Sequence, residues 1–71
     1  MGVDVWAVYR AVGGGYIVAM FKSQRGGAAL GKTLHVATME LARDVIPIHK
    51  NDLTCLAPTE DDPAELVETW I

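Results

Sequence analysis

The stretch VDVWAVYRAVGGGYIVAMFKS (residues 3–23) decides the fold of this chain. It places three consecutive glycines, Gly13 to Gly15, between two runs that are rich in β-branched and aromatic residues. Such runs favour strands, and glycine reaches positive φ at little steric cost. The stretch therefore predicts a β-hairpin over residues 3–23 that turns at the glycines.

Alternation along the first run places apolar side chains on both faces of this hairpin. One face would carry Val3, Val5, Ala7, Tyr9 and Ala11, and the other Asp4, Trp6, Val8, Arg10 and Val12. A sheet with two apolar faces needs cover on both sides, which a short chain can hardly supply. We therefore expect a homo-oligomer, or a complex with a protein partner. The expected interface side chains are Trp6, Val8, Phe21 and Trp70.

Length and composition support association. The chain has 71 residues, which we interpret as a single domain, and 51% of them are hydrophobic. A domain of this size buries only about 60% of the surface that its unfolded chain exposes, so its core is small. Cys55 is the one cysteine, which excludes an internal disulfide and suggests a reducing compartment. The apolar excess is best explained as surface that another chain covers.

The charge pattern separates the tail from the rest. Residues 1–59 carry six basic and four acidic side chains, whereas residues 60–71 carry five acidic side chains and none that is basic. The basic residues are scattered, which makes nucleic acid an unlikely partner. The sequence has no run of roughly 20 apolar residues and no signal-peptide pattern at its start, so we expect a cytoplasmic protein without a membrane segment.

After the hairpin, the sequence predicts a glycine-rich loop over residues 24–32 and an amphipathic helix over residues 33–44. Leu34, Ala37, Leu41 and Val45 recur at spacings of three and four, with Thr33 as the N-cap. The alternative is a strand through TLHVATMEL (residues 33–41), whose alternation is irregular.

The last third of the chain predicts a strand and a short helix. Residues 45–49 (VIPIH) resemble a strand, and Pro47 would place it at a sheet edge. In the tail, Asp62 would cap a helix over residues 63–70. That helix would dock through Leu66 and Trp70 and leave Glu65 and Glu68 in solvent.

These elements predict an α+β fold: a small antiparallel sheet, made of the hairpin and a third edge strand, with one packed helix and a short C-terminal helix. The alternative is a small SH3-like β-barrel. The segment VIPIHKNDLTCL (residues 45–56) resembles the closing segment of such barrels. The barrel would require residues 33–41 to form a strand.

The segment GGAALGKT (residues 26–33) contains Gly26, Gly31, Lys32 and Thr33 in the spacing G-x-x-x-x-G-K-[ST] and resembles the phosphate loop of P-loop NTPases. The resemblance covers about eight residues and the expected helix after them. A later acidic motif is lacking, and four residues separate the preceding strand from the loop. We therefore reject a complete NTPase and keep a phosphate or nucleotide site at these four residues as an alternative function.

Other candidate chemistry is weak. His35, His49 and Cys55 match no common zinc spacing, so we expect no metal site. Cys55 has no orienting third group, so we expect no catalytic residue and no cofactor. The sequence thus favours a non-enzymatic interaction or accessory module, of the size common in phages and mobile elements, that acts as a homo-oligomer. Anion binding at residues 26–33 and nucleic-acid binding are the alternatives.

Overall fold

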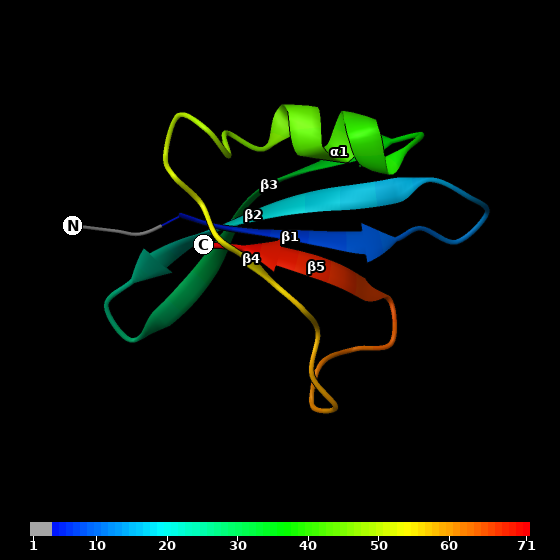
Figure 1. The fold of residues 1–71 in the computed structure, drawn as a ribbon. Helices are drawn as coiled ribbons and strands as arrows, with labels where there is room; N and C mark the ends of the chain where they lie inside the picture. The colour runs from blue at the N-terminus through cyan, green and yellow to red at the C-terminus, as the bar shows by residue number, and fades with distance from the viewer. Residues whose placement is uncertain (1–3) are drawn as a thin grey trace.

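The computed structural model describes residues 4–71 and shows a small antiparallel sheet of five strands with one short helix (Figure 1). The strands are β1 (Asp4–Arg10), β2 (Tyr16–Gln24), β3 (Gly27–Val36), β4 (Cys55–Leu56) and β5 (Leu66–Trp70), and the helix is α1 (Met39–Val45). Their order across the sheet is β3-β2-β1-β5-β4. β1 is therefore the central strand, with β3 and β4 at the two edges.

The hairpin predicted from the opening stretch is present. β1 pairs antiparallel with β2 over its whole length, from Asp4 opposite Lys22 to Arg10 opposite Tyr16. Gly13, Gly14 and Gly15 all have positive φ, between +76° and +112°, as the turn requires. Residues 1–3, and with them the first residue of the expected hairpin, lie outside the described residues.

The glycine-rich loop over residues 24–32 and the helix over residues 33–44 are both wrong. Residues 27–36 form β3, which pairs antiparallel with β2. The pairing runs from Gly27 opposite Gln24 to Val36 opposite Tyr16. β2 has nine residues, and its N–H and C=O groups on the side away from β1 need hydrogen-bond partners. A second hairpin, between β2 and β3, supplies them. The helix starts later, at Met39, and its N-cap is Thr38 rather than Thr33. The strand alternative for residues 33–41 was thus correct as far as Val36.

The strand expected at residues 45–49 is also wrong. Val45 ends α1, and Ile46 is its C-cap, with its N–H donating to the carbonyl of Ala42. The next residues form tight turns, with Ile48 N–H donating to Ile46 O and Asn51 N–H to Pro47 O. Pro47 has no N–H to offer a ladder, so a turn after the helix suits it better than a strand.

The tail forms a strand where we expected a helix. Residues 66–70 are β5, which pairs antiparallel with β1, Trp6 lying opposite Trp70 and Val8 opposite Glu68. Asp62 does cap, but it caps a turn: its Oδ2 accepts from the N–H of Thr59 at 2.8 Å. The second edge of the central strand β1 needs a partner, and this need outweighs the local helix signal.

The core lies between the sheet and α1. Its buried side chains come from two strands, the helix and the helix C-cap: Trp6, Val8, Val18, Met20, Ala42 and Ile46. The segment after α1 crosses the same face of the sheet, where Ile48 and Leu53 pack against this cluster (Figure 1). The molecule is therefore a sheet covered on one face. In residues 4–71 there is no helix long and apolar enough to cross a membrane.

Candidate protein-interaction surface

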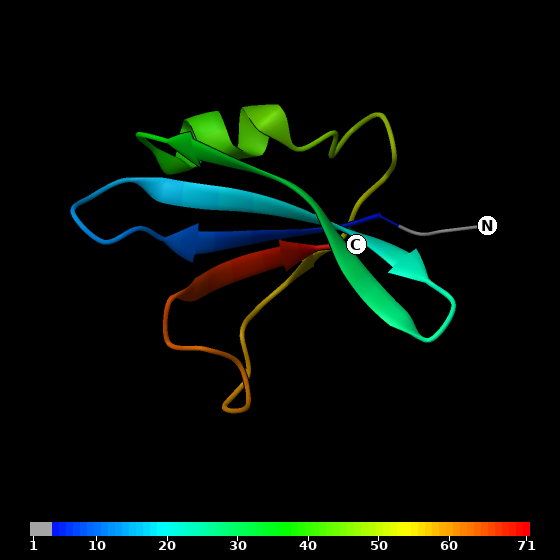
Figure 2. The same ribbon diagram turned by 180° about the vertical axis from the view of Figure 1, so that it is seen from behind.

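The face of the sheet away from α1 is the most unusual surface of the molecule, and we call it the open face. Strand registers assign its main side chains, which are Val5, Tyr9, Ile17, Phe21, Leu30 and Leu66, with the small Ala7 and Ala19 between them. Figure 2 shows the molecule from behind, with α1 and the segment that follows it on the other side of the strands.

The open face carries no Asp, Glu, Lys or Arg from any of the five strands. The strands' charged residues are Asp4, Arg10, Lys22, Lys32 and Glu68. All five share the register of Trp6, Val8, Val18 and Met20, so they belong to the α1 face. A sheet face turned to water is usually polar, with the apolar side chains on the covered face. Here the face not covered by α1 carries none of these charges, with Thr33, His35 and Thr69 among its polar side chains, and the charges surround the core.

Exposure agrees with this assignment. Leu30 is 58% exposed, and Leu56, opposite Thr69 on the same face, is 47% exposed. Val5, Tyr9 and Ile17 are half-buried by their neighbours within the sheet. Ala7 and Ala19 are buried. The result is a largely apolar surface over adjacent strands, bordered by Thr33, His35 and Thr69, and exposed apolar patches of this kind are typical of protein interfaces.

The expected interface residues divide between the two faces. Trp6 and Val8 are 7% and 0% exposed beneath α1, so their prediction as interface residues is wrong: the chain's own core contains them. Phe21 is half-buried on the open face. Trp70 is half-buried on the α1 face and packs against the core cluster. The sequence signal that distinguishes the open face from the face beneath α1 is the absence of charge at positions 5, 7, 9, 17, 19 and 21.

The four residues with the phosphate-loop spacing are not brought together. Gly26 lies in the turn between β2 and β3, whereas Gly31, Lys32 and Thr33 lie within β3. Lys32 and Thr33 are consecutive in a strand, so their side chains point to opposite faces. Lys32 Nζ lies 5.8 Å from the centre of the Trp6 ring. Thr33 is followed by strand rather than by a helix N-terminus, so the geometry that would hold a phosphate is missing here.

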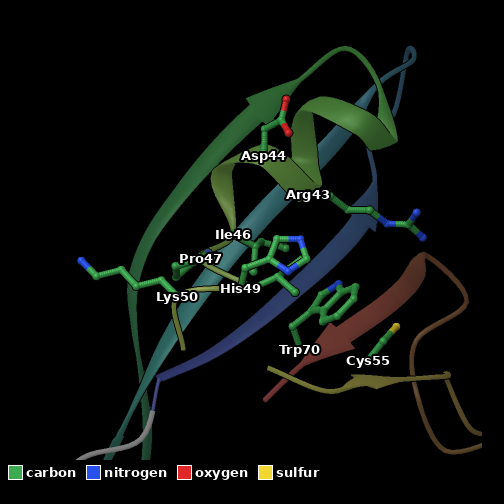
Figure 3. A pocket seen from close by; sticks show the side chains of 9 residues that line it. Arg43, Asp44, Ile46, Pro47, His49, Lys50, Cys55 and Trp70 are labelled. Atoms are coloured by element: carbon green, nitrogen blue, oxygen red, sulfur yellow. The ribbon is translucent and has the colours of Figure 1, made fainter. Parts of the chain in front are cut away.

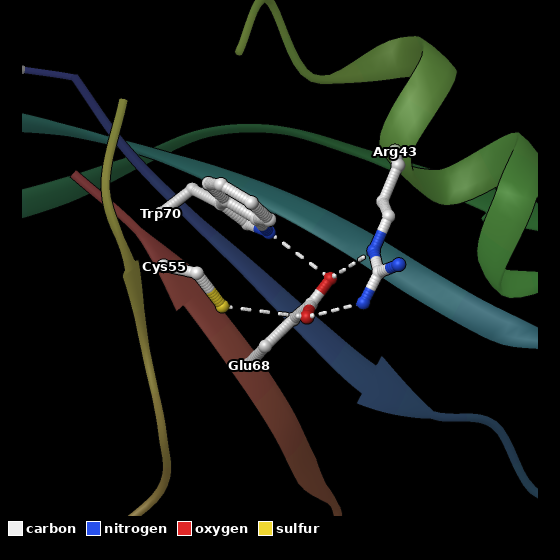
Figure 4. Close-up of polar contacts among 4 residues, drawn as sticks. All are labelled: Arg43, Cys55, Glu68 and Trp70. Carbon is white, nitrogen blue, oxygen red and sulfur yellow. Dashed lines mark hydrogen bonds and ion pairs between the residues drawn. The ribbon is translucent and has the colours of Figure 1, made fainter. Parts of the chain in front are cut away.

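A polar cluster ties the tail to the helix, and Figure 4 shows its four side chains. Glu68 of β5 is 6% exposed, although we expected it in solvent. Its Oε1 accepts from Arg43 Nε at 3.1 Å and from Trp70 Nε1 at 3.0 Å. Its Oε2 accepts from Arg43 Nη2 at 3.1 Å and from Cys55 Sγ at 3.5 Å. The cluster joins α1, β4 and β5.

These contacts shift two pKa values in opposite directions. Burial favours the neutral form of Glu68, but hydrogen bonds from Arg43, Trp70 and Cys55 outweigh it and hold the pKa of Glu68 below its ordinary value. Cys55 is exposed, but partial desolvation of its thiol and then the neighbouring Glu68 carboxylate raise the pKa of the thiol. A thiol kept protonated is a poor nucleophile, so Cys55 acts here as a donor rather than as a reactive group.

A cleft next to this cluster is lined by the end of α1, the turn after it and the β4–β5 edge. Figure 3 shows the His49 imidazole beside the Trp70 indole, with Lys50 pointing away. Arg43 also lines the cleft, but Glu68 already holds its guanidinium. His35, the other histidine, lies in β3, and its Nε2 is 3.2 Å from the carbonyl oxygen of Gly14. Among residues 4–71 no three metal-ligating side chains gather in one place.

Comparisons with known proteins give no family for this chain. No protein-family model matches it, and neither does any curated protein or solved structure.

Proposed function

We propose that this protein is a non-enzymatic interaction module that assembles with a second copy of itself through the open face. The observation that carries the proposal is the absence of charge from that face. Contact with water costs about 25 cal/mol for each Å² of apolar surface, and a second chain removes this cost.

The size of the face suits a dimer. The strands contain 33 residues. At about 3.3 Å of rise and about 4.8 Å of strand spacing, they cover roughly 520 Å² in projection. A stable interface of standard size buries about 800 Å² per partner. The accessible area of a corrugated face exceeds its projection, so the open face supplies most of what such an interface needs.

A face of this kind suits another sheet better than a small ligand. It is formed by the strands themselves, and its largest members, Tyr9 and Phe21, lie on adjacent strands. Two such sheets pack face to face with interdigitating side chains at a separation of about 10 Å. In a dimer with a two-fold axis, the open face of one chain would pack against the same face of the second chain.

Sedimentation velocity at micromolar concentration tests the proposal. We expect the wild-type chain to sediment at twice its mass of 7.7 kDa. Leu30→Asp puts a charge on the exposed part of the open face and should raise the dissociation constant at least tenfold. Ile17→Asp puts one between Tyr9 of β1 and His35 of β3 and should produce monomer, with the circular dichroism spectrum reporting whether the fold is kept.

Val12→Asp is the matched control, because Val12 is fully exposed in the turn between β1 and β2. It adds the same charge away from the strands of the open face and should leave the dimer intact. A wild-type chain that stays at 7.7 kDa throughout, or a Leu30→Asp chain that dimerises as tightly as Val12→Asp, would overturn the proposal.

A further inference from the structure

The β2–β3 ribbon and the loop before β5 carry opposite charges. Residues 16–36, which span the ribbon, contain Lys22, Arg25 and Lys32 and no acidic residue. Lys32 lies over the Trp6 ring on the α1 face. Lys22 and Arg25 are exposed near the ribbon tip (residues 21–30), which extends beyond α1 in Figures 1 and 2. Asp4 on β1 lies opposite Lys22 and offsets its charge. The charge of Arg25 is not offset in this way, so the tip has a net positive charge.

The loop of residues 57–65, which we call the acidic loop, has the sequence APTEDDPAE. Its four acidic residues are Glu60, Asp61, Asp62 and Glu65, and it contains no basic residue. All its residues are exposed, and the loop projects from the β4–β5 edge (Figures 1 and 2). Asp62 accepts from the N–H and the hydroxyl of Thr59, which holds the loop in a defined turn.

Within one chain these charges do not meet. Across the sheet, two to four strand spacings, about 10–19 Å, separate the ribbon from the strands that the acidic loop joins. The two elements also lie at opposite ends of the strands, because Lys22 is opposite Asp4 at the start of β1 and the acidic loop enters β5 opposite Tyr9. Arg43–Glu68 is the ion pair found among residues 4–71. The basic tip and the acidic loop are thus available to another molecule, and each has the charge that the other needs.

We infer that the acidic loop of one copy docks on the basic ribbon tip of a second copy. The inference rests on the proposed self-association, and it names the contact that gives that association its orientation. Apolar groups match as well. Phe21 and Leu30 pair across the tip on the open face, and they continue the apolar surface toward the edge. Ala57, Pro58, Pro63 and Ala64 of the acidic loop offer small apolar groups to them.

Charge complementarity sets the orientation because the open face by itself has none. Apolar contacts are non-directional, so two uncharged sheet faces can slide or rotate against each other. Opposite charges at the rim select one arrangement and penalise those that bring like charges together. Two such contacts would form in a symmetric dimer, one on each side of the axis.

Charge exchange between the two elements tests the inference. In the ribbon variant, Lys22→Glu and Arg25→Glu make the tip acidic. In the loop variant, Glu60→Lys, Asp61→Lys and Glu65→Lys replace three of the four acidic residues, which makes the loop basic and leaves Asp62 in its turn. Each variant alone should dimerise at least fivefold more weakly than wild type, because both of its contacts join like charges. An equimolar mixture should recover wild-type affinity, because both contacts then join opposite charges. Added NaCl should weaken the wild-type dimer.

The matched control separates this contact from a general effect of net charge. Lys50→Glu and Asn51→Asp lower the net charge by three, close to the four of the ribbon variant, at exposed positions outside both the tip and the acidic loop. Mixed with the loop variant, this control should not recover wild-type affinity. Recovery with the control, or unchanged affinity in both charge variants, would overturn the inference while leaving the apolar dimer in place.

A ribbon variant that loses binding to a DNA duplex while its dimer is unchanged would also overturn it, in favour of a nucleic-acid contact. A monomeric wild-type chain would instead show that the proposed function itself fails.

Discussion

Arg43 and Glu68 lie 25 positions apart in the sequence, and their side chains form a two-point ion pair, with both N–O distances at 3.1 Å. The pair joins the single helix to the last strand. Glu68 is buried and Arg43 is about half exposed, so this pair lies between a surface ion pair and a fully buried one.

The first prediction concerns the contribution of this pair to stability. Glu68→Gln keeps the size of the side chain but removes the charge that faces Arg43. Surface pairs contribute about 0–1 kcal/mol and broken buried pairs cost about 3–5 kcal/mol, so we expect a loss of about 1–3 kcal/mol in the free energy of unfolding. Urea denaturation measures it. Glu65→Gln, at an exposed position in the acidic loop, is the control and should change stability by less than about 0.5 kcal/mol.

The second prediction is a pH dependence with a definite sign. The folded-state pKa of Glu68 lies below its ordinary value of 4.5. Protons therefore bind more readily to the unfolded chain, and the stabilisation is complete above about pH 5 and lost as pH falls through the folded pKa. The stability difference between wild type and Glu68→Gln should shrink between pH 6 and pH 3. A difference that stays constant over this range would contradict the assigned shift.

The third prediction concerns Cys55. Partial desolvation and the Glu68 carboxylate raise the pKa of its thiol, so less thiolate is present in the folded chain at pH 8 than in the unfolded chain. Iodoacetamide should alkylate Cys55 several times more slowly in native buffer than in urea. Glu68→Gln should speed the native reaction without unfolding the chain. Equal rates in native buffer and urea would show that the thiol is free of its neighbours.

The hairpin was predictable because its signal is local. Two β-branched runs joined by three glycines specify strand, turn and strand within residues 3–23. The tail was mispredicted for the opposite reason. Asp62 and Pro63 give a local helix signal, yet β1 requires a second neighbour for its backbone groups, and β1 lies 57 to 64 positions away from its partners in β5. Glu68 alternates correctly for a strand, but its buried partner Arg43 comes from another element and leaves no trace in the local pattern.

The candidate surface was half predictable. The two-sided apolar hairpin was visible in the sequence, and it indicated that one face would need a partner. Which face the helix covers could not be read from composition, since Trp6 and Tyr9 are both large and apolar. Charge gives the answer in retrospect: Asp4, Arg10 and Lys22 lie at the ends of the covered face, where long side chains reach water around the core.

The last prediction tests the turn that starts the fold. Gly13 and Gly15 have similar positive φ, +88° and +76°, so alanine is strained at both. They differ in their surroundings. A Cβ at Gly13 would meet nothing within 4 Å, whereas a Cβ at Gly15 would lie 2.6 Å from the carbonyl oxygen of Val36 at the end of β3.

Gly13→Ala therefore measures the cost of backbone strain alone, about 1–2 kcal/mol. Gly15→Ala adds a clash with backbone that cannot move without separating β3 from β2. We expect it to lower the free energy of unfolding by at least about 1 kcal/mol more than Gly13→Ala, as measured by urea denaturation. If the two variants unfold at the same urea concentration, the close approach of the turn to β3 is not part of what stabilises the sheet.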